Sequence, residues 1–353
     1  MSSASTDHRP PSLATTEAPP PILSVRGLSK FFPMHRKGFL KKPAGTVRAV
    51  DNVSFDLRPG ETLGLVGESG SGKTTTARCI LRALDPTAGA VLFRKPDGST
   101  VDLATLSGRA LKGLRPQMQM VFQDPFASLN PRMTVGQIVG EPLVIHGMAR
   151  GEELDARVAD ILKKVGLKPE HRSRYPHAFS GGQRQRIGIA RALVMRPSLI
   201  VADEAVSALD MSVQAQVLNL LKDLQAEFKL TYLFVAHNLG VVRHFCDRVA
   251  VMYAGRIVEV SPTAQLFERP LHPYTKALLA AVPWPDPDMK MKFDVPGEIP
   301  DLSHLPAGCA FHPRCPECFT PCRSFRPELL GVAGIGGREA ACHLHDPAQV
   351  SSS

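Results

Sequence analysis

The chain has 353 residues, of which 43% are hydrophobic, and it carries a formal net charge of +9 at pH 7. That length allows one large or two modest globular domains, and no apolar run approaches the roughly 18 to 20 residues of a membrane-spanning helix. Met1–Pro21 is rich in Ser, Thr and Pro and lacks a basic start followed by an apolar segment, which argues against a signal peptide and predicts a disordered tail. We therefore expect a soluble protein that stays in the cytoplasm.

Part of the positive charge lies in a basic stretch that follows the first predicted strand, whose signals begin at Ile22–Val25, and reaches into the start of the next, Val47–Leu57. Its basic residues are Arg36, Lys37, Lys41, Lys42 and Arg48. The stretch has no acidic residue and lacks the aromatic interleaving of a nucleic-acid-binding surface. We interpret it as a solvated loop and expect no nucleic-acid partner.

Two aromatic residues, Phe31 and Phe32, close the first predicted strand. An aromatic ring at this place could stack on an adenine base or could pack in the protein core, and the sequence leaves both open. Because a nucleotide site is predicted further along the chain, we take Phe32 as the candidate for an adenine contact.

A phosphate-binding loop is predicted between a strand-like run at Thr62–Val66 and a helix-compatible run at Thr75–Leu84. The residues between them fit the pattern G-x-x-x-x-G-K-[ST], in which glycines let backbone N–H groups turn toward phosphate oxygens. The positive end of the following helix adds to this attraction. Lys73 would reach the outer phosphates, and the hydroxyl of Thr74 would bind Mg²⁺. The candidate nucleotide-binding residues are Gly67, Glu68, Ser69, Gly70, Ser71, Gly72, Lys73, Thr74 and Thr75.

A buried strand is predicted at Gln117–Phe122, and Gln123 opens the loop that follows it. This loop, Asp124–Met133, holds prolines and apolar residues that suit either a surface contacting another protein or an ordinary packed loop. Thr134–Val165 then carries two segments of helical period, which Gly140, Pro142 and Gly147 would interrupt, and it predicts a small helical subdomain.

A second glycine-rich helix start follows, in which Ser180 is a candidate N-cap. Two glycines and a capping hydroxyl at a helix start form an anion-binding end. A chain that binds one nucleotide by itself does not need a second such end, so we expect a partner's nucleotide to use it. The candidate residues are Ser180, Gly181, Gly182 and Gln183.

Two acidic residues, Asp203 and Glu204, end the apolar run Leu199–Ala202, which is typical of a central parallel strand. Acids at the tip of a buried strand are costly unless they have a function. Asp203 could hold Mg²⁺ through water, and Glu204 could take a proton from an attacking water. His237, after the predicted strand Thr231–Val235, is a candidate phosphate contact at the same sheet edge, although a lone histidine is more often an ordinary surface or core residue.

Five of the seven cysteines lie between Cys309 and Cys342, in a part of the chain that becomes proline-rich from Leu266. Cys79 and Cys246 stand alone in apolar surroundings. In a reducing compartment this density favours a metal site over disulfides. Four thiolates can hold one zinc ion or an iron–sulfur cluster, and unliganded thiols are the remaining alternative.

Five elements, in this order, resemble the ATP-binding subunits of ABC transporters over about Ile22 to Ser261. They are Gly67–Thr74 for Walker A, Gln123 for the Q-loop, Ser180–Gln183 for the signature, Leu199–Glu204 for Walker B and His237 for the switch histidine. Three further blocks are similar to the C-terminal extension of oligopeptide and dipeptide importer ATPases: Leu271–Leu279, Gly297–Pro300 and Cys309–Cys315. The run Ala205–Asp210 is more like the second ATPase of such a pair than the first. Phe179, where leucine is commoner, is a conservative departure.

The resemblance implies an α/β fold. Its core would be that of a P-loop NTPase, with a mostly parallel sheet, an antiparallel β subdomain, a helical subdomain and a small cysteine-containing C-terminal extension. We expect a tail at 1–21, an ATP-binding domain at 22–265 with its helical subdomain at about 134–195, and the extension at 266–353.

The resemblance also implies ATP hydrolysis with Mg²⁺ in a head-to-tail dimer, where Ser180 and Gly182 contact the partner's nucleotide. The implied catalytic residues are Glu204, His237, Gln123 and Lys73, and the implied Mg²⁺ ligands are Thr74, Gln123 and Asp203. The partners would be a sister ATPase, or a second copy of this chain, and two membrane permeases docked near Gln123. A substrate-binding protein would act indirectly, and the subunit would lie at the cytoplasmic side of the inner membrane.

For the cysteines, the resemblance favours a structural 4Fe–4S cluster, with zinc as the alternative. The matching ligands are Cys309, Cys315, Cys322 and Cys342, which leaves Cys318 as a spare. The cargo stays open, because metal, glutathione and antibiotic transporters use the same ATPase. A soluble ABC protein acting on ribosomes or DNA usually carries two motif sets or a long coiled coil, and this chain has neither.

Overall fold

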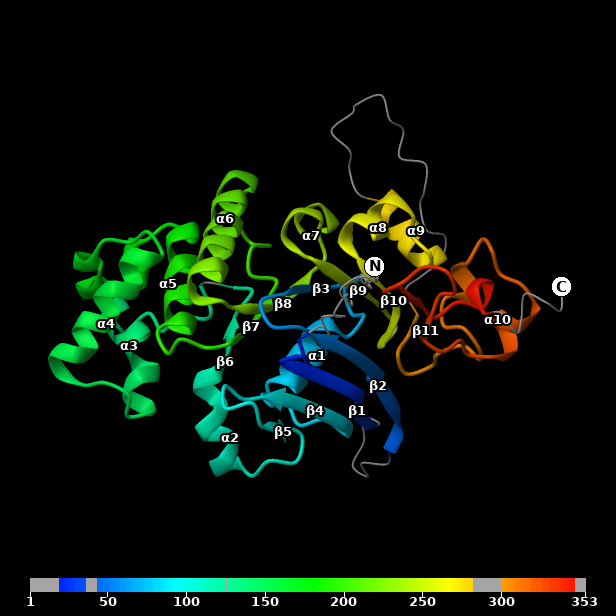
Figure 1. Ribbon diagram of the computed structural model, residues 1–353, viewed down its shortest axis with the longest axis horizontal. Helices are drawn as coiled ribbons and strands as arrows, with labels where there is room; N and C mark the ends of the chain where they lie inside the picture. Colours follow the sequence, from blue (N-terminus) through cyan, green and yellow to red (C-terminus); the bar gives the residue numbers. More distant parts are fainter. Residues whose placement is uncertain (1–18, 36–42, 125, 282–299, 347–353) are drawn as a thin grey trace, which may run out of the picture.

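A computed structural model describes residues 19–35, 43–124, 126–281 and 300–346 of the chain. Residues 1–18 of the predicted tail, residues 36–42 of the basic stretch and all but the last residue of the Gly297–Pro300 block lie outside the described residues. Two sheets, a group of helices and a C-terminal extension make up the described part (Figure 1).

The larger sheet has the strand order β11-β12-β10-β9-β3-β8-β7-β6. Its five neighbouring strands β9, β3, β8, β7 and β6 run parallel to one another. Strands β3, β7 and β8 are buried along their whole length, as their continuous apolar runs predict. The bounds are β3 Thr62–Val66, β6 Met118–Val121, β7 Leu199–Asp203, β8 Thr231–Ala236, β9 Arg248–Tyr253, β10 Arg256–Pro262, β11 Leu330–Gly331 and β12 Glu339–Ala340.

The smaller sheet is antiparallel and has the order β2-β1-β4-β5. Its strands are β1 Leu23–His35, β2 Pro43–Leu57, β4 Ala88–Arg94 and β5 Thr100–Asp102. Helix α1 (Lys73–Ile80) lies between the two sheets, and its buried residues Ala77 and Ile80 join one core with β1, β2 and one face of β3 (Figure 1). The predicted antiparallel β subdomain is therefore present beside a mostly parallel sheet.

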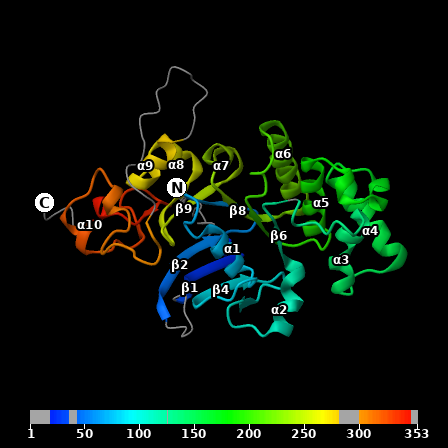
Figure 2. The ribbon, with the colours of Figure 1, turned by 180° about the vertical axis from the view of Figure 1, so that it is seen from behind.

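Helices cover the other face of the larger sheet, around a second core. Figures 1 and 2 show α3 and α4 at one end of the molecule and the C-terminal extension at the opposite end. The helix bounds are α2 Gly108–Leu114, α3 Val135–Ile145, α4 Gly151–Lys164, α5 Gly181–Leu193, α6 Met211–Phe228, α7 Leu239–Phe245, α8 Thr263–Glu268, α9 Pro273–Ala280 and α10 Thr320–Ser324. None of the described helices is both long and apolar enough to cross a membrane.

Two helix predictions were wrong in detail. The helix after the phosphate loop spans Lys73–Ile80 rather than Thr75–Leu84, because Arg82 adopts a left-handed backbone with φ 52° that a helix cannot include. Gly140 and Pro142 lie inside α3 and do not interrupt it. A Cβ atom on Gly140 would come within 3.1 Å of Leu154 on α4, so the glycine lets these two helices pack closely.

The C-terminal extension is joined to the larger sheet and shares its core. Strand β12 pairs with β10, and a fully buried ion pair joins Arg338 to Glu259 at 3.1 Å. The ring of Phe311, which is 1% exposed, packs against Tyr253 of β9 and Tyr274 of α9. The proline-rich segment therefore has a core, which the sequence did not reveal because the main domain supplies part of it.

Candidate functional site

The four central motifs meet at one edge of the larger sheet. Because β6, β7, β8 and β3 are parallel, the residues that follow them lie at the same edge. These residues are Gln123 after β6, Glu204 after β7, His237 after β8 and Gly67 after β3. The parallel register thus joins parts of the chain that are far apart in sequence.

The phosphate loop is held in a shape that only glycine permits at two positions. Gly67 has φ 152°, and a Cβ atom there would collide with the carbonyl oxygen of Met252 on β9. Gly72 has φ 104°, and a Cβ atom there would collide with the carbonyl oxygen of Ala49 on β2. Gly72 is also the N-cap of α1, so this helix points its positive end into the loop. The loop is a backbone cradle with the chemistry of a phosphate site.

The ammonium group of Lys73 lies inside this cradle. Its Nζ donates to the carbonyl oxygens of Gly67 and Glu68, each at 2.8 Å, and the side chain is buried. Burial lowers the pKa of Lys73, while the nearby carboxylates of Glu204 and Asp203 act in the opposite direction. A phosphate in the cradle would supply the anionic partner that two neutral carbonyls do not. The remaining loop residues, Ser69, Gly70 and Ser71, and Thr75 on α1, line the loop and the first turn of the helix.

Thr74 and Asp203 form a pair that suits a magnesium ion. The Thr74 hydroxyl donates to Asp203 Oδ1 at 2.9 Å. Burial raises the pKa of Asp203, and the hydrogen bond from Thr74 is the strongest opposing influence. A divalent cation bound here would replace that hydroxyl proton as the partner of the buried carboxylate, and hydroxyl and carboxylate oxygens are the ligands Mg²⁺ prefers.

The carboxylate of Glu204 contacts two side chains, those of Gln123 and His237. Its Oε2 accepts a hydrogen bond from Gln123 Nε2 at 2.8 Å and lies 3.2 Å from Nδ1 of His237. The residue adopts a left-handed backbone with φ 48°, an unusual conformation for glutamate that turns its side chain out of the strand direction. The carboxylate is 15% exposed, whereas Asp203 beside it is buried. Glu204 therefore faces the space where a water could reach it.

The second glycine-rich helix start lies on α5, outside this cluster. Ser180 is the N-cap, and its side chain accepts from Gln183 N while its own N–H donates to Gln183 Oε1 at 3.1 Å. The N-cap prediction is confirmed. Gly181 and Gly182 form the first turn, and a Cβ atom on Gly182 would collide with Val213 of α6. This helix end is self-capped, exposed at Ser180, and makes its hydrogen bonds within α5.

Phe32 is 37% exposed on β1, with the Lys30 ammonium 5.1 Å from the centre of its ring. It is thus not a core residue and remains free to stack on a base.

The loop after Gln123 is mixed, because Leu129 is buried in the core whereas Phe126 is 56% exposed under the guanidinium of Arg184. The loop is thus partly packed and partly exposed, and its contact with another protein stays a prediction.

Two contacts on the phosphate loop were not foreseen. The hydroxyl of Tyr274 on α9 accepts a hydrogen bond from the Glu68 N–H at 2.8 Å. Arg314 forms a bidentate ion pair with the Glu68 carboxylate. Both residues stand in blocks that resemble the importer extension, but no local pattern links them to Glu68. Distances of 206 and 246 residues along the chain separate them from it.

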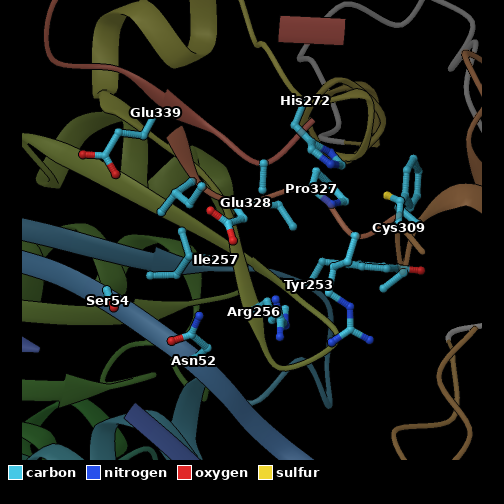
Figure 3. A pocket seen from close by; sticks show the side chains of 16 residues that line it. Asn52, Ser54, Tyr253, Arg256, Ile257, His272, Cys309, Pro327, Glu328 and Glu339 are labelled. Carbon is cyan, nitrogen blue, oxygen red and sulfur yellow. The ribbon is translucent and has the colours of Figure 1, made fainter. Parts of the chain in front are cut away.

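A cavity of about 510 Å³ lies between β2, β10 and the extension (Figure 3). Asn52 and Ser54 line it from β2, Arg256 and Ile257 from β10, and Cys309 from the extension. None of its lining residues belongs to the predicted nucleotide motifs. The cavity is separate from the sheet edge at which Gln123, Glu204 and His237 meet, and it lies between the extension and a strand of the antiparallel sheet.

The clustered cysteines are free thiols in one part of the extension. The Cys309 N–H donates to the carbonyl of Cys322 at 2.9 Å. The pKa of Cys315 is raised to about 11 and that of Cys342 to about 12, mainly by burial, with neighbouring cysteines acting in the same direction. Across the described ranges, no group of three or more His, Cys, Asp or Glu residues is placed to hold a metal ion. The predicted metal centre therefore stays a prediction.

Comparisons with known proteins agree with this geometry. Residues 50–207 match the family model described as ABC transporter, and residues 258–322 match the oligopeptide/dipeptide transporter C-terminal region. A probable peptide ABC transporter ATP-binding protein of Sinorhizobium fredii is 52% identical over 93% of this chain and 91% of its own length. The oligopeptide transport ATP-binding protein AppF of Bacillus subtilis is 49% identical over 92% of this chain and 97% of its own.

Solved structures give the same result. A dimeric ATP-binding cassette in a post-hydrolysis state with ADP and Pi has a TM-score of 0.59 and 30% identity, and covers 68% of this chain and 98% of its own. A cassette from Clostridium perfringens, part of an ABC transporter complex, has a TM-score of 0.59 and 28% identity, over 71% of this chain and 92% of its own. The chain therefore belongs to the ATP-binding proteins of ABC transporters, in the group that carries the oligopeptide/dipeptide transporter C-terminal region.

Proposed function

We propose that this protein is the ATP-hydrolysing subunit of an importer that carries peptides across the cytoplasmic membrane. The observation that carries the cargo class is the match of residues 258–322 to the oligopeptide/dipeptide transporter C-terminal region, in addition to the ATP-binding cassette. Relatives described as peptide or oligopeptide transport proteins are similar over nearly the whole chain, which supports the same cargo.

We assign the chemistry to the residues at the sheet edge. Lys73 and the N–H groups of the phosphate loop bind the triphosphate, while Phe32 stacks on the adenine ring. Thr74, Asp203 and Gln123 would hold a magnesium ion, which would supply positive charge next to the phosphates. Glu204 takes the proton of the attacking water, and Gln123 and His237 hold its carboxylate in place.

The second helix start completes the site from a partner. Ser180, Gly181, Gly182 and Gln183 would contact the nucleotide of the facing subunit, and a similar cassette solved as a dimer supports this arrangement. We infer a heterodimer with a sister ATPase, in which this chain is the second member, and a homodimer is the alternative. Two permeases would dock near the loop after Gln123, and a substrate-binding protein would act through them.

This assembly would place the protein at the cytoplasmic face of the inner membrane as a peripheral subunit. Within the chain, we infer a tail at 1–21, an ATP-binding domain at 22–265 with the helical subdomain at about 134–195, and the extension at 266–353. The last boundary separates units of function rather than of folding, because β12 and β11 of the extension continue the larger sheet from β10.

Transport by the reconstituted complex tests this function. The complete transporter in lipid vesicles should take up labelled di- and oligopeptides only with MgATP, and Glu204→Gln should stop uptake. Uptake of a metal chelate, glutathione or an antibiotic without peptide uptake would replace the cargo and keep the ATPase. ATP hydrolysis that responds to ribosomes or DNA and not to permeases would contradict the transporter.

For the extension, we propose that Cys309, Cys315, Cys322 and Cys342 bind a structural 4Fe–4S cluster, with Cys318 as a spare. Five free thiols within one small segment supply the sulfur ligands that iron or zinc requires. Metal binding would have to deprotonate thiols whose pKa values burial has raised, so it should release protons.

Protein purified without oxygen should contain iron and sulfide in stoichiometric amounts. Cys315→Ser should lose both, whereas Cys318→Ser, the matched control, should keep them. One equivalent of zinc in colourless protein would replace the cluster with a zinc site. Metal-free protein with five titratable thiols in the extension would contradict both.

A further inference from the structure

An acidic side chain stands inside the phosphate loop, where it opposes the function of the loop. Glu68 directly follows Gly67, and its side chain is 22% exposed. Carboxylates repel the phosphate oxygens of ATP, and the repulsion is strong where water is partly excluded. An unpaired Glu68 would therefore weaken nucleotide binding at the cradle.

The extension provides the partner that removes this repulsion. Arg314 donates from Nη1 to Glu68 Oε2 at 3.0 Å and from Nη2 to Oε1 at 3.1 Å. Two parallel hydrogen bonds hold the carboxylate in one plane, and the positive guanidinium balances its negative charge. Only 7% of the Arg314 side chain is exposed, and its guanidinium lies 5.9 Å from the ring centres of both Tyr253 and Phe311. The arginine is thus fixed before it meets the loop.

A second contact from the extension holds the loop backbone. Tyr274, which is fully buried on α9, accepts from the Glu68 N–H at 2.8 Å. On the opposite side, the carbonyl of Ser71 accepts from Gly255 N–H at 3.0 Å. The N–H of Glu68 is therefore turned toward the protein, and the Ser71 N–H donates to the Glu68 carbonyl at 3.2 Å.

We propose that Arg314 and Tyr274 are positioning residues for ATP binding, which act by neutralising and orienting Glu68 in the phosphate loop. The C-terminal extension thereby becomes part of the nucleotide site without touching the nucleotide. Arg314 precedes Cys315 directly and closes the short helical turn His312–Arg314, so the fold of the cysteine segment sets the position of the arginine. This inference concerns ATP binding and does not depend on the cargo.

Binding of a fluorescent ATP analogue to the full-length protein tests the proposal. Arg314→Met keeps most of the length of the side chain and removes its charge, so ATP affinity should fall roughly 10-fold or more. Glu68→Gln is the reference without the carboxylate charge, and it should bind ATP more tightly than Arg314→Met, because the repelling charge is gone. The double variant Glu68→Gln/Arg314→Met should recover affinity to within about threefold of Glu68→Gln alone.

Arg326→Met is the matched control. Arg326 is also an extension arginine that pairs with a carboxylate of the main domain, Asp51, at 3.1 Å, but it does not contact the loop. Its loss should leave ATP affinity within about twofold, since Arg256 still pairs with Asp51. The defect of Arg314→Met should also shrink at high salt, because a charge repulsion is screened and a misfolded loop is not.

Tyr274→Phe should weaken ATP binding by roughly three- to tenfold at any salt concentration, because it frees a backbone donor. Should Arg314→Met fail to fold, the double variant carries the test, since it leaves no unpaired charge behind. Full affinity in Arg314→Met, an equal loss in Arg326→Met, or a double variant as weak as Arg314→Met would overturn the proposal.

Discussion

The protein has two glycine-rich helix starts, and they differ in how far the chain itself completes them. The phosphate loop before α1 is enclosed by β2, by the β9–β10 hairpin and by the extension, through Ala49, Met252, Gly255 and Tyr274. The signature turn before α5 is capped by its own Ser180–Gln183 pair and has an exposed N-cap.

This difference explains how the two sites can serve one reaction. The phosphate loop is complete within the chain, so it can bind a nucleotide before any partner arrives. The signature turn offers a preformed anion-binding end that is capped by its own residues. We therefore expect the phosphate loop to govern nucleotide binding. The signature turn should contribute to hydrolysis only when a facing subunit brings its nucleotide. Four predictions test this contrast.

The largest effect should follow from Glu204→Gln. The amide keeps the shape of the side chain and its contacts with Gln123 and His237 but cannot accept the proton of water, so hydrolysis should fall by roughly 10²- to 10⁴-fold. ATP binding should be retained, because the phosphate loop is untouched. Phosphate release by the assembled complex measures the first effect and equilibrium binding the second. Turnover close to that of the parent would remove Glu204 as the base.

Lys73→Ala should reduce binding itself. Loss of the buried ammonium that we assign to phosphate binding should weaken ATP affinity by roughly 10- to 100-fold, as expected for a charged hydrogen bond. Titration of dilute protein with an ATP analogue measures it. Ser180→Ala is the matched control, since it should leave this monomer affinity unchanged while slowing hydrolysis in the dimer. A loss of monomer affinity in Ser180→Ala would place the signature in the chain's own site.

The isolated chain should gain specific activity as its concentration rises, because in the proposed dimer the signature comes from a second molecule. Addition of the sister ATPase and the permeases should accelerate hydrolysis further. The measurement is phosphate release per molecule over a dilution series, together with the molecular mass at each concentration. Full activity in a sample that is monomeric throughout would contradict action across a dimer.

The smallest effect should be on stability, and it should distinguish Gly182 of the signature turn from Gly67 of the phosphate loop. Gly182→Ala would collide with the side chain of Val213, so it should lower the free energy of unfolding by about 1–3 kcal/mol, and Val213→Ala should restore part of it. Gly67→Ala would collide with the backbone carbonyl of Met252, which no side-chain substitution can remove. Urea unfolding of the single and double variants measures the compensation. A Gly182→Ala protein as stable as the parent would indicate that this turn is loosely packed.

Much of the catalytic edge could be predicted from the sequence. The strand runs at Thr62–Val66 and Leu199–Ala202 are local apolar patterns, and the residues after them carry the expected chemistry. The N-cap at Ser180 was also predicted, because capping depends on residues three positions apart. Helix ends were less certain, and the left-handed turn at Arg82 ended α1 earlier than the pattern indicated.

The sequence by itself determined the phosphate loop, the order of the motifs and the family, because each of these depends on residues close together in the chain. Only the tertiary structure decided that Gln123 and His237 meet at one oxygen of Glu204, because parallel strand pairing sets that edge. It also decided that Arg314 pairs with Glu68, 246 residues away. Complementary charges can be read from a sequence, but which two of them meet depends on how the extension packs on the larger sheet.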